Sequence, residues 1–218
     1  MKPMTSEVPT LDERVRRRLA EIANMEPTVD LTKRDSYSMA AGWNVDAREI
    51  HLPSEAPGAP APDGTFATAC GILREYSFPP KRLIRGTFDH DHPLDNRAML
   101  LNARFLWLRF ELPVRVSRVI DERRETDAGP EQVWGYSYFT LAGHLERGEI
   151  TFEIIKQVAS GDVRFRIHSF SQTDHIPNMI YRWGFKLIGR RLQRRFAEKS
   201  LENMQLLVTT ALASHTPV

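Results

Sequence analysis

Apolar and polar residues alternate in short runs through the second half of the chain. Three of these runs, 132–141, 149–157 and 163–170, are rich in β-branched and aromatic residues and predict β-strands. The tripeptide Ser160-Gly161-Asp162 between the last two runs is typical of a hairpin turn. Residues 114–120 alternate in the same way. The pattern therefore predicts an antiparallel meander.

Beyond the meander, the apolar spacing changes from two residues to the helical repeat, starting at Pro177 and continuing to about Ala213. The stripe consists of Gly184, Ile188, Leu192, Phe196, Ser200, Met204 (or Asn203), Leu207 and Ala211. At about 1.5 Å per residue this helix is roughly 50 Å long, which lets it lie across a whole sheet. We therefore expect an α+β fold in which a curved antiparallel sheet is gripped by a long C-terminal helix.

The first half of the chain is less regular. Residues 11–25 have the spacing of an amphipathic helix, whereas 29–63 include a Pro-rich stretch and predict little regular structure. Residues 66–72 and 83–88 indicate short strands, and 91–105 indicate either one helix or a helix that breaks into a strand near Asn102.

This contrast suggests two parts. Residues 1–64 are expected to be an N-terminal helix and a Pro-rich extension or linker, and residues 65–218 the domain in which the helix grips the sheet.

Strand alternation assigns side chains to the two faces of the meander. Pairing across the hairpin turn places Ile154 opposite Ile167 and Phe152 opposite Ser169. The inner face then collects Ile150, Phe152, Ile154, Val163, Phe165 and Ile167, whereas Thr151, Glu153, Arg164, Arg166 and His168 face solvent.

The register of the 132–141 strand is left open by the sequence. If Tyr138 lies opposite Phe152, the residues Trp134, Tyr136, Tyr138 and Thr140 also face inward. Buried tyrosines either bond to the backbone within a core or keep a polar end in a wet cavity. On the second reading, the predicted ligand pocket consists of Trp134, Tyr136, Tyr138, Phe152, Ile154, Phe165, Ile167 and Ser169.

Composition narrows the function classes. The chain has 218 residues and a net charge of +2, which argues against a dedicated nucleic-acid binder. No run is long and apolar enough to span a bilayer, and with no apolar run of the signal-peptide type near the start we expect a cytoplasmic protein. The single cysteine, Cys70, excludes an internal disulfide. The sequence does not decide the oligomeric state.

The C-terminal helix carries a local excess of positive charge. Between Tyr181 and Lys199 there are seven basic residues and one acid, Glu198. Such a helix either binds anionic lipid or nucleic acid, or keeps its basic side chains in water while its apolar stripe grips the sheet. The second reading is simpler, because the stripe is already needed to close the core.

The most suggestive chemistry lies in the turn between two predicted strands, where His144, Glu146 and Glu149 fall within six residues. An imidazole exchanges protons near neutral pH, and a carboxylate can orient it. The structural alternative is a tight turn shaped by glycines. No second histidine has the spacing of a metal site, and no nucleotide-binding glycine loop is present, so neither a metal nor an organic cofactor is expected.

A second polar run, Asp89-His90-Asp91-His92, has residue types that bind metals. However, Pro93 follows it, and helix capping by Asp91 or a solvated loop explains the run without a metal.

The run from Tyr138 to Phe152, Y-F-T-L-A-G-H-L-E-R-G-E-I-T-F, resembles the signature of an uncharacterised bacterial and plant family, whose core pattern is T-L-x-G-H-x-E-x-G-E-x-x-F. The resemblance extends from about Leu73 to Leu201 and leaves the first 60 or so residues uncovered. Members of this family of unknown function look similar to the START-like, or SRPBCC, helix-grip superfamily. Those proteins enclose an apolar cavity between a curved sheet and a long C-terminal helix, so the resemblance implies such a cavity here.

Two function hypotheses use this implied cavity. In the first, the protein binds a small hydrophobic or amphipathic molecule, with His144 and Glu149 at one mouth. In the second, it is a cofactor-independent cyclase, isomerase or dehydratase. His144 would then be the general acid or base, Glu146 or Glu149 its orienting partner, and Tyr138 a donor to a developing oxyanion. A third hypothesis is a membrane-surface or interaction protein that uses the basic helix.

Overall fold

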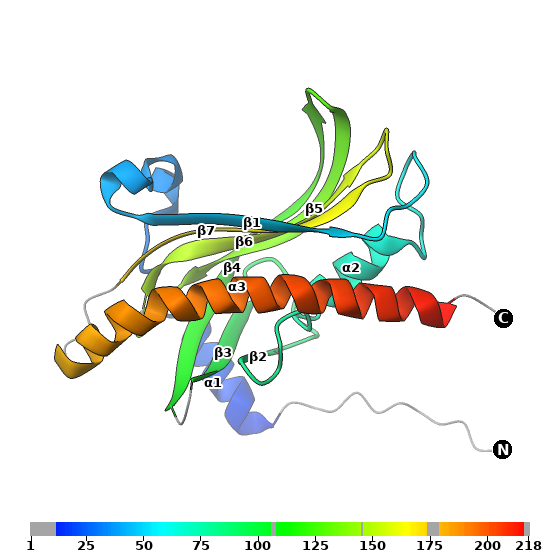
Figure 1. Ribbon diagram of the computed structural model, residues 1–218. Coiled ribbons are helices and arrows are strands. Elements are labelled where there is room, and N and C mark those ends of the chain that lie inside the picture. The colour runs from blue at the N-terminus through cyan, green and yellow to red at the C-terminus, as the bar shows by residue number, and fades with distance from the viewer. Residues whose placement is uncertain (1–11, 106–107, 145, 174–178, 216–218) are drawn as a thin grey trace, which may run out of the picture.

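The computed structural model of the chain describes residues 12–105, 108–144, 146–173 and 179–215, and these form a curved antiparallel sheet with a long helix lying across its concave face (Figure 1). The strands are β1 (Asn44–Leu52), β2 (Ile84–Phe88), β3 (Ala98–Phe105), β4 (Leu108–Thr126), β5 (Gly129–Thr140), β6 (Glu146–Gln157) and β7 (Val163–Thr173). The helices are α1 (Glu13–Ala23), α2 (Thr65–Arg74) and α3 (Met179–His215), with two short 3₁₀ helices, η1 (Leu31–Ser36) and η2 (Met39–Ala41).

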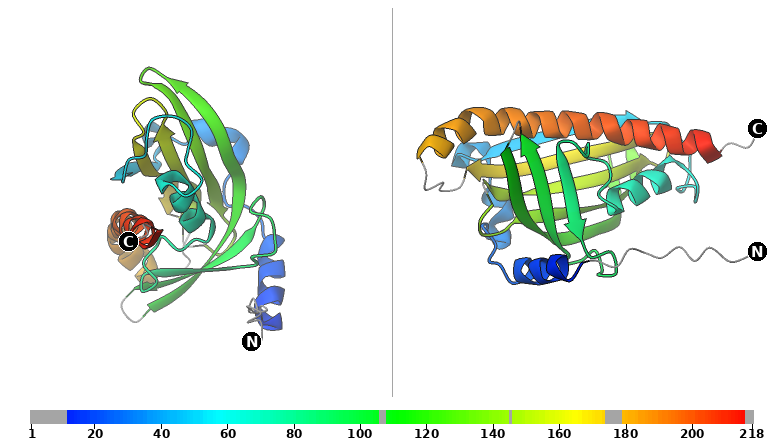
Figure 2. Two further views of the ribbon diagram at one scale, coloured as in Figure 1. Left: turned by 90° about the vertical axis from the view of Figure 1, so that its right-hand side faces the viewer. Right: turned by 90° about the horizontal axis from the view of Figure 1, so that it is seen from below.

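The described strands form one sheet in the order β1-β7-β6-β5-β4-β3-β2. Strands β2 to β7 follow the chain as a meander, and β1 adds to its far edge by pairing antiparallel with β7. The helix α3 has 37 residues, which corresponds to about 55 Å, and it spans the width of the sheet (Figures 1 and 2). The expected α+β helix-grip architecture is confirmed. The residue at which the C-terminal helix was expected to start, Pro177, lies outside the described residues.

Three expectations for the first half are corrected. Residues 44–52, within the segment expected to lack regular structure, form β1. The run 66–72 is not a strand but part of α2. Residues 91–105, expected as one helix or as a helix that breaks into a strand near Asn102, form a loop and then the strand β3 from Ala98, with no helix. Since β1 belongs to the sheet, the boundary expected at residue 64 does not separate an extension from the sheet.

Each correction has a physical reason. In α2, Phe66, Ala69 and Leu73 are buried at helical spacing, whereas a strand would alternate. In β3, Leu101 faces the main core while Leu100 packs in the cluster that includes α1 residues on the other face. Because both faces of β3 are covered, its apolar run is continuous and imitates a helix.

The meander differs from the expected pairing by two residues. Phe152 lies opposite Ile167 on β7 and Tyr136 on β5, and Tyr138 lies opposite Ile150. A shift of two residues leaves every side chain on its expected face, whereas a shift of one would invert them. The inner face is therefore the one expected, and its residues belong to the main core.

The part of the concave face around Phe78 is a closely packed core. Phe78 is fully buried, and its ring lies 4.9 Å from that of Phe152 and 5.3 Å from that of Phe165, measured between centroids. From the other side, α3 holds this segment in place, because Asn203 donates a side-chain hydrogen bond of 2.9 Å to the Phe78 carbonyl. The buried residues of the described part of α3 are Ala197, Ser200, Leu201, Met204 and Val208.

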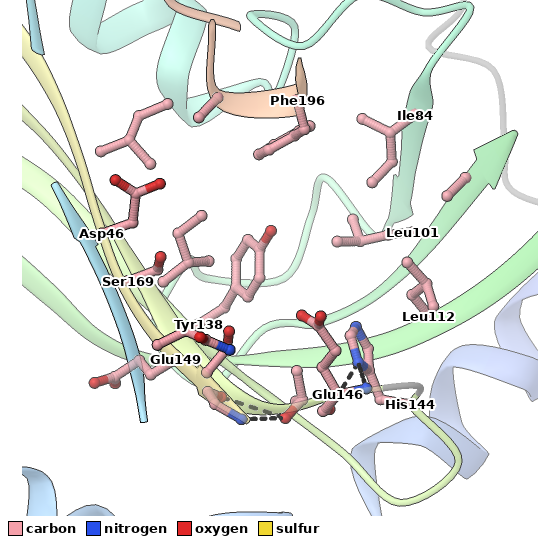
Figure 3. Close-up of a pocket in the computed structure, with 18 of the residues that line it drawn as sticks. Asp46, Ile84, Leu101, Leu112, Tyr138, His144, Glu146, Glu149, Ser169 and Phe196 are labelled. Atoms are coloured by element: carbon pink, nitrogen blue, oxygen red, sulfur yellow. Dashed lines mark hydrogen bonds between the residues drawn. The ribbon is translucent and has the colours of Figure 1, made fainter. Parts of the chain in front are cut away.

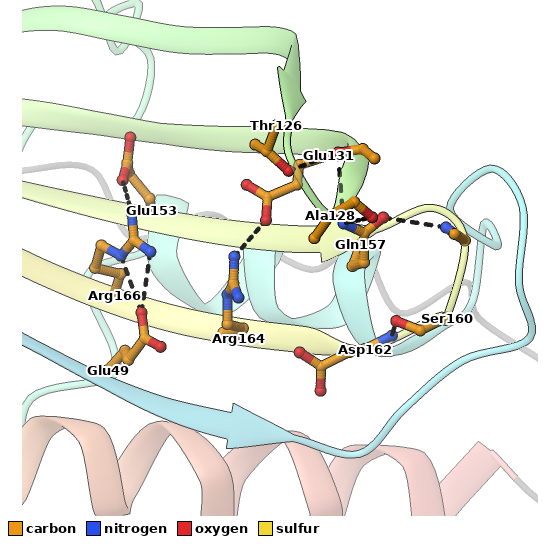
Figure 4. Close-up of polar contacts among 12 residues, drawn as sticks. Glu49, Thr126, Ala128, Glu131, Glu153, Gln157, Ser160, Asp162, Arg164 and Arg166 are labelled. Atoms are coloured by element: carbon orange, nitrogen blue, oxygen red, sulfur yellow. Dashed lines mark hydrogen bonds and ion pairs between the residues drawn. The ribbon is translucent and has the colours of Figure 1, made fainter.

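Part of the outer face, where β1, β7 and β6 run side by side, carries charged side chains, as the alternation predicts. Arg166 lies 3.0 Å from Glu49 and 3.9 Å from Glu153, and Arg164 lies 2.5 Å from Glu131 (Figure 4). Elsewhere on the same face, α1 packs over an apolar cluster that includes Leu100 and Phe139, whereas α2 and α3 occupy the concave side. Among the described helices, none is long and apolar enough to cross a membrane.

Candidate functional site

A cavity of about 200 Å³ lies on the same concave face, beside the packed core around Phe78. Every strand of the sheet and α3 contribute to its walls. The hydrophobic side chains among the lining residues are Leu83, Ile84, Leu101, Ala103, Phe110, Leu112, Tyr138, Ile150, Ile167, Phe196 and Ala197. Figure 3 shows Phe196 directed into the cavity from α3, opposite Tyr138 on the sheet. The cavity is thus a mainly apolar enclosure between sheet and helix.

The cavity is displaced from the predicted pocket. Tyr138, Ile167 and Ser169 line it. The other predicted pocket residues lie in the packed core instead: Trp134, Tyr136, Phe152, Ile154 and Phe165. The reason is that α2 and the Phe78 segment fill the space beneath them.

One end of the cavity is polar. Along β7 the inner face changes from Ile167 to Ser169 and Ser171, and the register places these beside Asp46 and Asn44 on β1. The inner face of β6 likewise changes from an apolar to a polar side chain, from Ile150 to Glu146. We call this group the polar end: Asn44, Asp46, Glu146, Ser169 and Ser171.

His144 stands beside the polar end, on the turn between β5 and β6. The turn is closed by a 3.0 Å hydrogen bond from the His144 N–H to the Leu141 carbonyl. Nδ1 of the ring lies 3.0 Å from the backbone nitrogen of Glu146 and accepts its hydrogen when the ring proton is on Nε2. Figure 3 shows the ring of His144 and the carboxylate of Glu146 side by side, with the carboxylate directed into the cavity. The structure therefore brings these two candidates together.

The side chain of Glu149, the third candidate in this segment, does not lie beside His144 and Glu146. It follows Gly148 and points to the outer face, where its side chain is 2% exposed. There its carboxylate accepts hydrogen bonds of 2.6 and 2.7 Å from the guanidinium of Arg34 and one of 2.5 Å from the Ser117 hydroxyl. A β-bulge between Val116 and Arg118 supplies Ser117. The expectation that Glu149 and His144 share one mouth is wrong, since the sheet lies between their side chains.

Tyr138 lies where the solid core meets the cavity. Its hydroxyl is 3.3 Å from that of Tyr76, and burial raises the pKa of Tyr138 to about 12. The phenol therefore stays protonated at neutral pH and can donate a hydrogen bond. Tyr76 adopts φ +49°, and a Cβ at Gly86 would lie 2.7 Å from its ring, so Gly86 makes room for this tyrosine.

Sequence reasoning missed Tyr76 and the β1 residues Asn44 and Asp46. For β1 a signal was present, because Asp46, Arg48, Ile50 and Leu52 share one face of an alternating run. The inner residues at its start are polar, which is why the run did not stand out as a strand. No comparable signal marked Tyr76.

The other sequence candidates do not join the site. In the Asp89–His92 run, the Asp89 side chain accepts from the Asp91 N–H at 3.1 Å, and His90 lies 3.0 Å from Glu75. Within the described ranges, no group of three or more His, Cys, Asp or Glu side chains could hold a metal ion. Of the basic helix residues, Arg194, Arg195 and Lys199 are exposed. The side chains of Arg182, Lys186, Arg190 and Arg191 lie outside the described residues.

Residues 26–203 match the family model described as "Domain of unknown function (DUF1990)". The chain belongs to this family. The match begins at residue 26, so the segment from there to residue 64, which the sequence resemblance left uncovered, is part of the DUF1990 domain. Both β1 and the loop that follows it are included.

Solved structures with a related layout have low sequence identity to this DUF1990 protein. Norcoclaurine synthase from Thalictrum flavum, in complex with dopamine and hydroxybenzaldehyde, is 10% identical, with 81% of this chain and 90% of that chain covered and a TM-score of 0.49. TTHA0849 from Thermus thermophilus is 12% identical, with coverages of 79% and 100% and a TM-score of 0.47. Ara h 8.0201 is 11% identical, with coverages of 78% and 99% and a TM-score of 0.46. No curated protein matches the chain.

Proposed function

We propose that this protein binds a small amphipathic molecule in the cavity between the sheet and α3. The observation that carries the proposal is the cavity itself, which has apolar walls, one polar end and a volume of about 200 Å³. Ligand sites are typically concave, mostly apolar and fitted with a few convergent polar groups. A cavity of this small volume fits a molecule with one or two rings or with a short chain. The expected cytoplasmic location stays a prediction.

A fluorescence titration with N-phenylnaphthylamine, which is uncharged at neutral pH, tests this proposal. The variant Ala103→Phe places a ring in the cavity wall, because Ala103 faces inward from β3. We expect it to weaken probe binding at least tenfold. The matched control, Ala213→Phe, adds the same group at an exposed position of α3 and should bind as the wild type does.

Circular dichroism and the unfolding midpoint of both variants show whether each is folded. If folded Ala103→Phe binds the probe as tightly as Ala213→Phe does, or if the wild type binds no probe, the cavity is not a binding site for small apolar molecules.

A second candidate function is a cofactor-independent cyclase, isomerase or dehydratase in the same cavity. The observation that favours it is the position of His144 beside Glu146, with the protonated Tyr138 hydroxyl farther along the same wall (Figure 3). His144 would move a proton, Glu146 would orient or polarise it, and Tyr138 would donate to a developing oxyanion. Glu149 has no part in this assignment.

The enzyme assignment is tested by screening neutral carbonyl compounds for loss of an α-proton, followed by His144→Asn. A positioned acid or base contributes about a hundredfold or more, so turnover should fall by that factor while the binding of N-phenylnaphthylamine stays unchanged. Turnover that survives in His144→Asn would remove His144 from the mechanism.

A further inference from the structure

Two buried tyrosines meet where the packed core borders the cavity. The hydroxyl of Tyr76 lies 3.3 Å from that of Tyr138, and these residues are 5% and 6% exposed. Among the described residues, neither hydroxyl has a second hydrogen-bond partner. The neighbouring Tyr136 differs, because its hydroxyl donates to the Leu73 carbonyl at 3.3 Å. Each phenol carries one hydrogen, so the single bond between Tyr76 and Tyr138 leaves one hydroxyl hydrogen unused.

The surroundings of the pair determine which hydrogen stays free. Tyr76 does not line the cavity, and its ring packs 5.2 Å from that of Phe78 and 6.5 Å from that of Phe152, measured between centroids. Tyr138 does line the cavity, and Figure 3 shows its hydroxyl directed away from the sheet into the cavity. An unpaired hydroxyl hydrogen in a packed core costs free energy, so the favoured donor is Tyr76 and the acceptor is Tyr138. The hydrogen of Tyr138 is then free to be donated into the cavity.

The end of α2 holds Tyr76 in an uncommon backbone conformation. Ser77 donates its N–H to the Ile72 carbonyl at 3.2 Å. Tyr76 donates its own N–H to the Leu73 carbonyl at 3.0 Å, which completes a Schellman motif. The residue in this position is usually glycine, because its φ is positive, and for Tyr76 φ is +49°. A tyrosine in this conformation is strained, and such strain is concentrated at functional sites.

We propose that the ligand carries an uncharged oxygen acceptor, such as a carbonyl, on its apolar body, and that this oxygen accepts a hydrogen bond from Tyr138. Tyr76 is a positioning residue, because its bond to Tyr138 orients that phenol and strengthens it as a donor. Burial raises the pKa of both phenols, so both stay protonated at neutral pH. This inference rests on the proposed binding function and names the ligand class.

Two probes of nearly equal shape test the preference for an acceptor: methyl naphthyl ketone and isopropenylnaphthalene, in which a methylene group replaces the carbonyl oxygen. Each is titrated by displacement of N-phenylnaphthylamine from the wild type and from Tyr138→Phe. We expect the ratio of ketone affinity to alkene affinity to be about tenfold higher in the wild type, which corresponds to about 1.4 kcal/mol, as for one hydrogen bond. The transfer of each probe out of water is the same for both proteins, so it cancels in this comparison.

Infrared spectroscopy gives a second measurement that needs no variant. The carbonyl band of the bound ketone should lie below its position in cyclohexane, because a donated hydrogen bond weakens the C=O bond. In Tyr138→Phe the band should return toward the cyclohexane position. A variant that merely loosened the fold would not produce this specific shift.

Tyr76→Phe tests the positioning role. We expect the affinity ratio to fall about threefold and the carbonyl band to lie between those of the wild type and Tyr138→Phe, with alkene binding unchanged. The matched control is Tyr136→Phe, which removes a buried hydroxyl from the same strand without touching the cavity wall. It should leave both the ratio and the band unaltered.

The outcomes separate the two proposals. A carbonyl band at the cyclohexane position in the wild type, or an affinity ratio that is unchanged in folded Tyr138→Phe, overturns the acceptor preference while the binding function stands. A ratio and a band that stay at wild-type values in Tyr76→Phe overturn its positioning role. If the wild type binds neither N-phenylnaphthylamine nor either of the two probes, both proposals fall together.

Discussion

A buried ion pair between Lys156 and Glu55 holds the loop that leads into α2, and we expect its removal to lower the free energy of unfolding. The Lys156 ammonium faces inward from β6, is 1% exposed, and lies 2.5 Å from the carboxylate of Glu55, which is 6% exposed. Lys156 also donates to the carbonyls of Ala56 and Ala59 at 3.1 Å each. One lysine thus ties down the loop that leads into α2.

Glu55 has a second function in the same place. Its carboxylate accepts hydrogen bonds from the N–H groups of Phe66 at 2.6 Å and Ala61 at 3.2 Å. Phe66 belongs to the first turn of α2, and the N-cap residue before this helix, Gly64, has no side chain to cap it. An acid from the loop that precedes α2 therefore supplies the negative charge that this helix end favours.

Glu55→Gln keeps the shape and removes the charge. The ammonium of Lys156 would then be buried with carbonyl partners alone, and breaking a buried pair in this way typically costs about 3–5 kcal/mol. We expect a loss of about 3 kcal/mol in the free energy of unfolding, because the amide oxygen of Gln can still accept from Phe66. Guanidinium unfolding followed by tryptophan fluorescence measures it, and an unchanged m-value shows that the change is one of stability.

A double-mutant cycle with Lys156→Met provides the control. Since the double variant buries no charge, it should lose less stability than the two single variants combined, with a coupling of about 1 kcal/mol or more. Strictly additive losses, or a Glu55→Gln protein within about 0.5 kcal/mol of the wild type, would show that the pair does not hold the loop.

The pH dependence gives an independent check. Burial by itself raises the pKa of Glu55, but the hydrogen bonds from Lys156, Phe66 and Ala61 outweigh it, and the pKa lies below the ordinary value of 4.5. The charged form is therefore favoured in the folded state. Its contribution is present above pH 4.5 and is lost as the pH falls through the lower folded value. Unfolding midpoints of Glu55→Gln should show less of this acid loss than those of the wild type.

Two further predictions separate structural residues from site residues. Glu149→Gln should lower the free energy of unfolding by about 1.5–3 kcal/mol, because it replaces a charged hydrogen-bond partner of the partly exposed Arg34 guanidinium by a neutral one, yet N-phenylnaphthylamine binding should stay within twofold of the wild-type value. Tighter or lost binding would mean that Glu149 reaches the cavity. The thiol of Cys70 should resist iodoacetamide in the folded protein at mildly alkaline pH, since burial raises its pKa to about 12. Rapid alkylation detected by mass spectrometry, without unfolding, would contradict this.

Much of the second half of the fold was predictable because one face of its strands is consistently apolar, whereas the other carries many polar and charged side chains, such as Glu153, Arg164 and Arg166. Alternation assigned Phe152, Ile154, Phe165 and Ile167 to the inner face correctly, even though the pairing differed by two residues. Period-2 patterns determine the face but not the partner, since every even shift satisfies them equally.

The location of the cavity was not predictable by the same reasoning. It depends on which part of the concave face Phe78 and α2 fill, and these contacts join segments far apart in the chain. The polar end depends on β1, whose pairing with β7 likewise has no local signal. His144 and Glu146 were found because they share one turn, whereas Asp46 comes from the other edge of the sheet.

The pairing of β1 with β7 also has a consequence for how the site forms during synthesis. The first strand can find its neighbour in the sheet only after nearly the whole chain has been made, and α3 follows later still. Contacts between such distant segments are slow to form because the loop between them must first be closed. The meander from β2 to β7 can assemble earlier from local hairpins. Asp46 and Phe196 would then arrive last, so a ligand present during folding could bind only after this final step and would favour its completion.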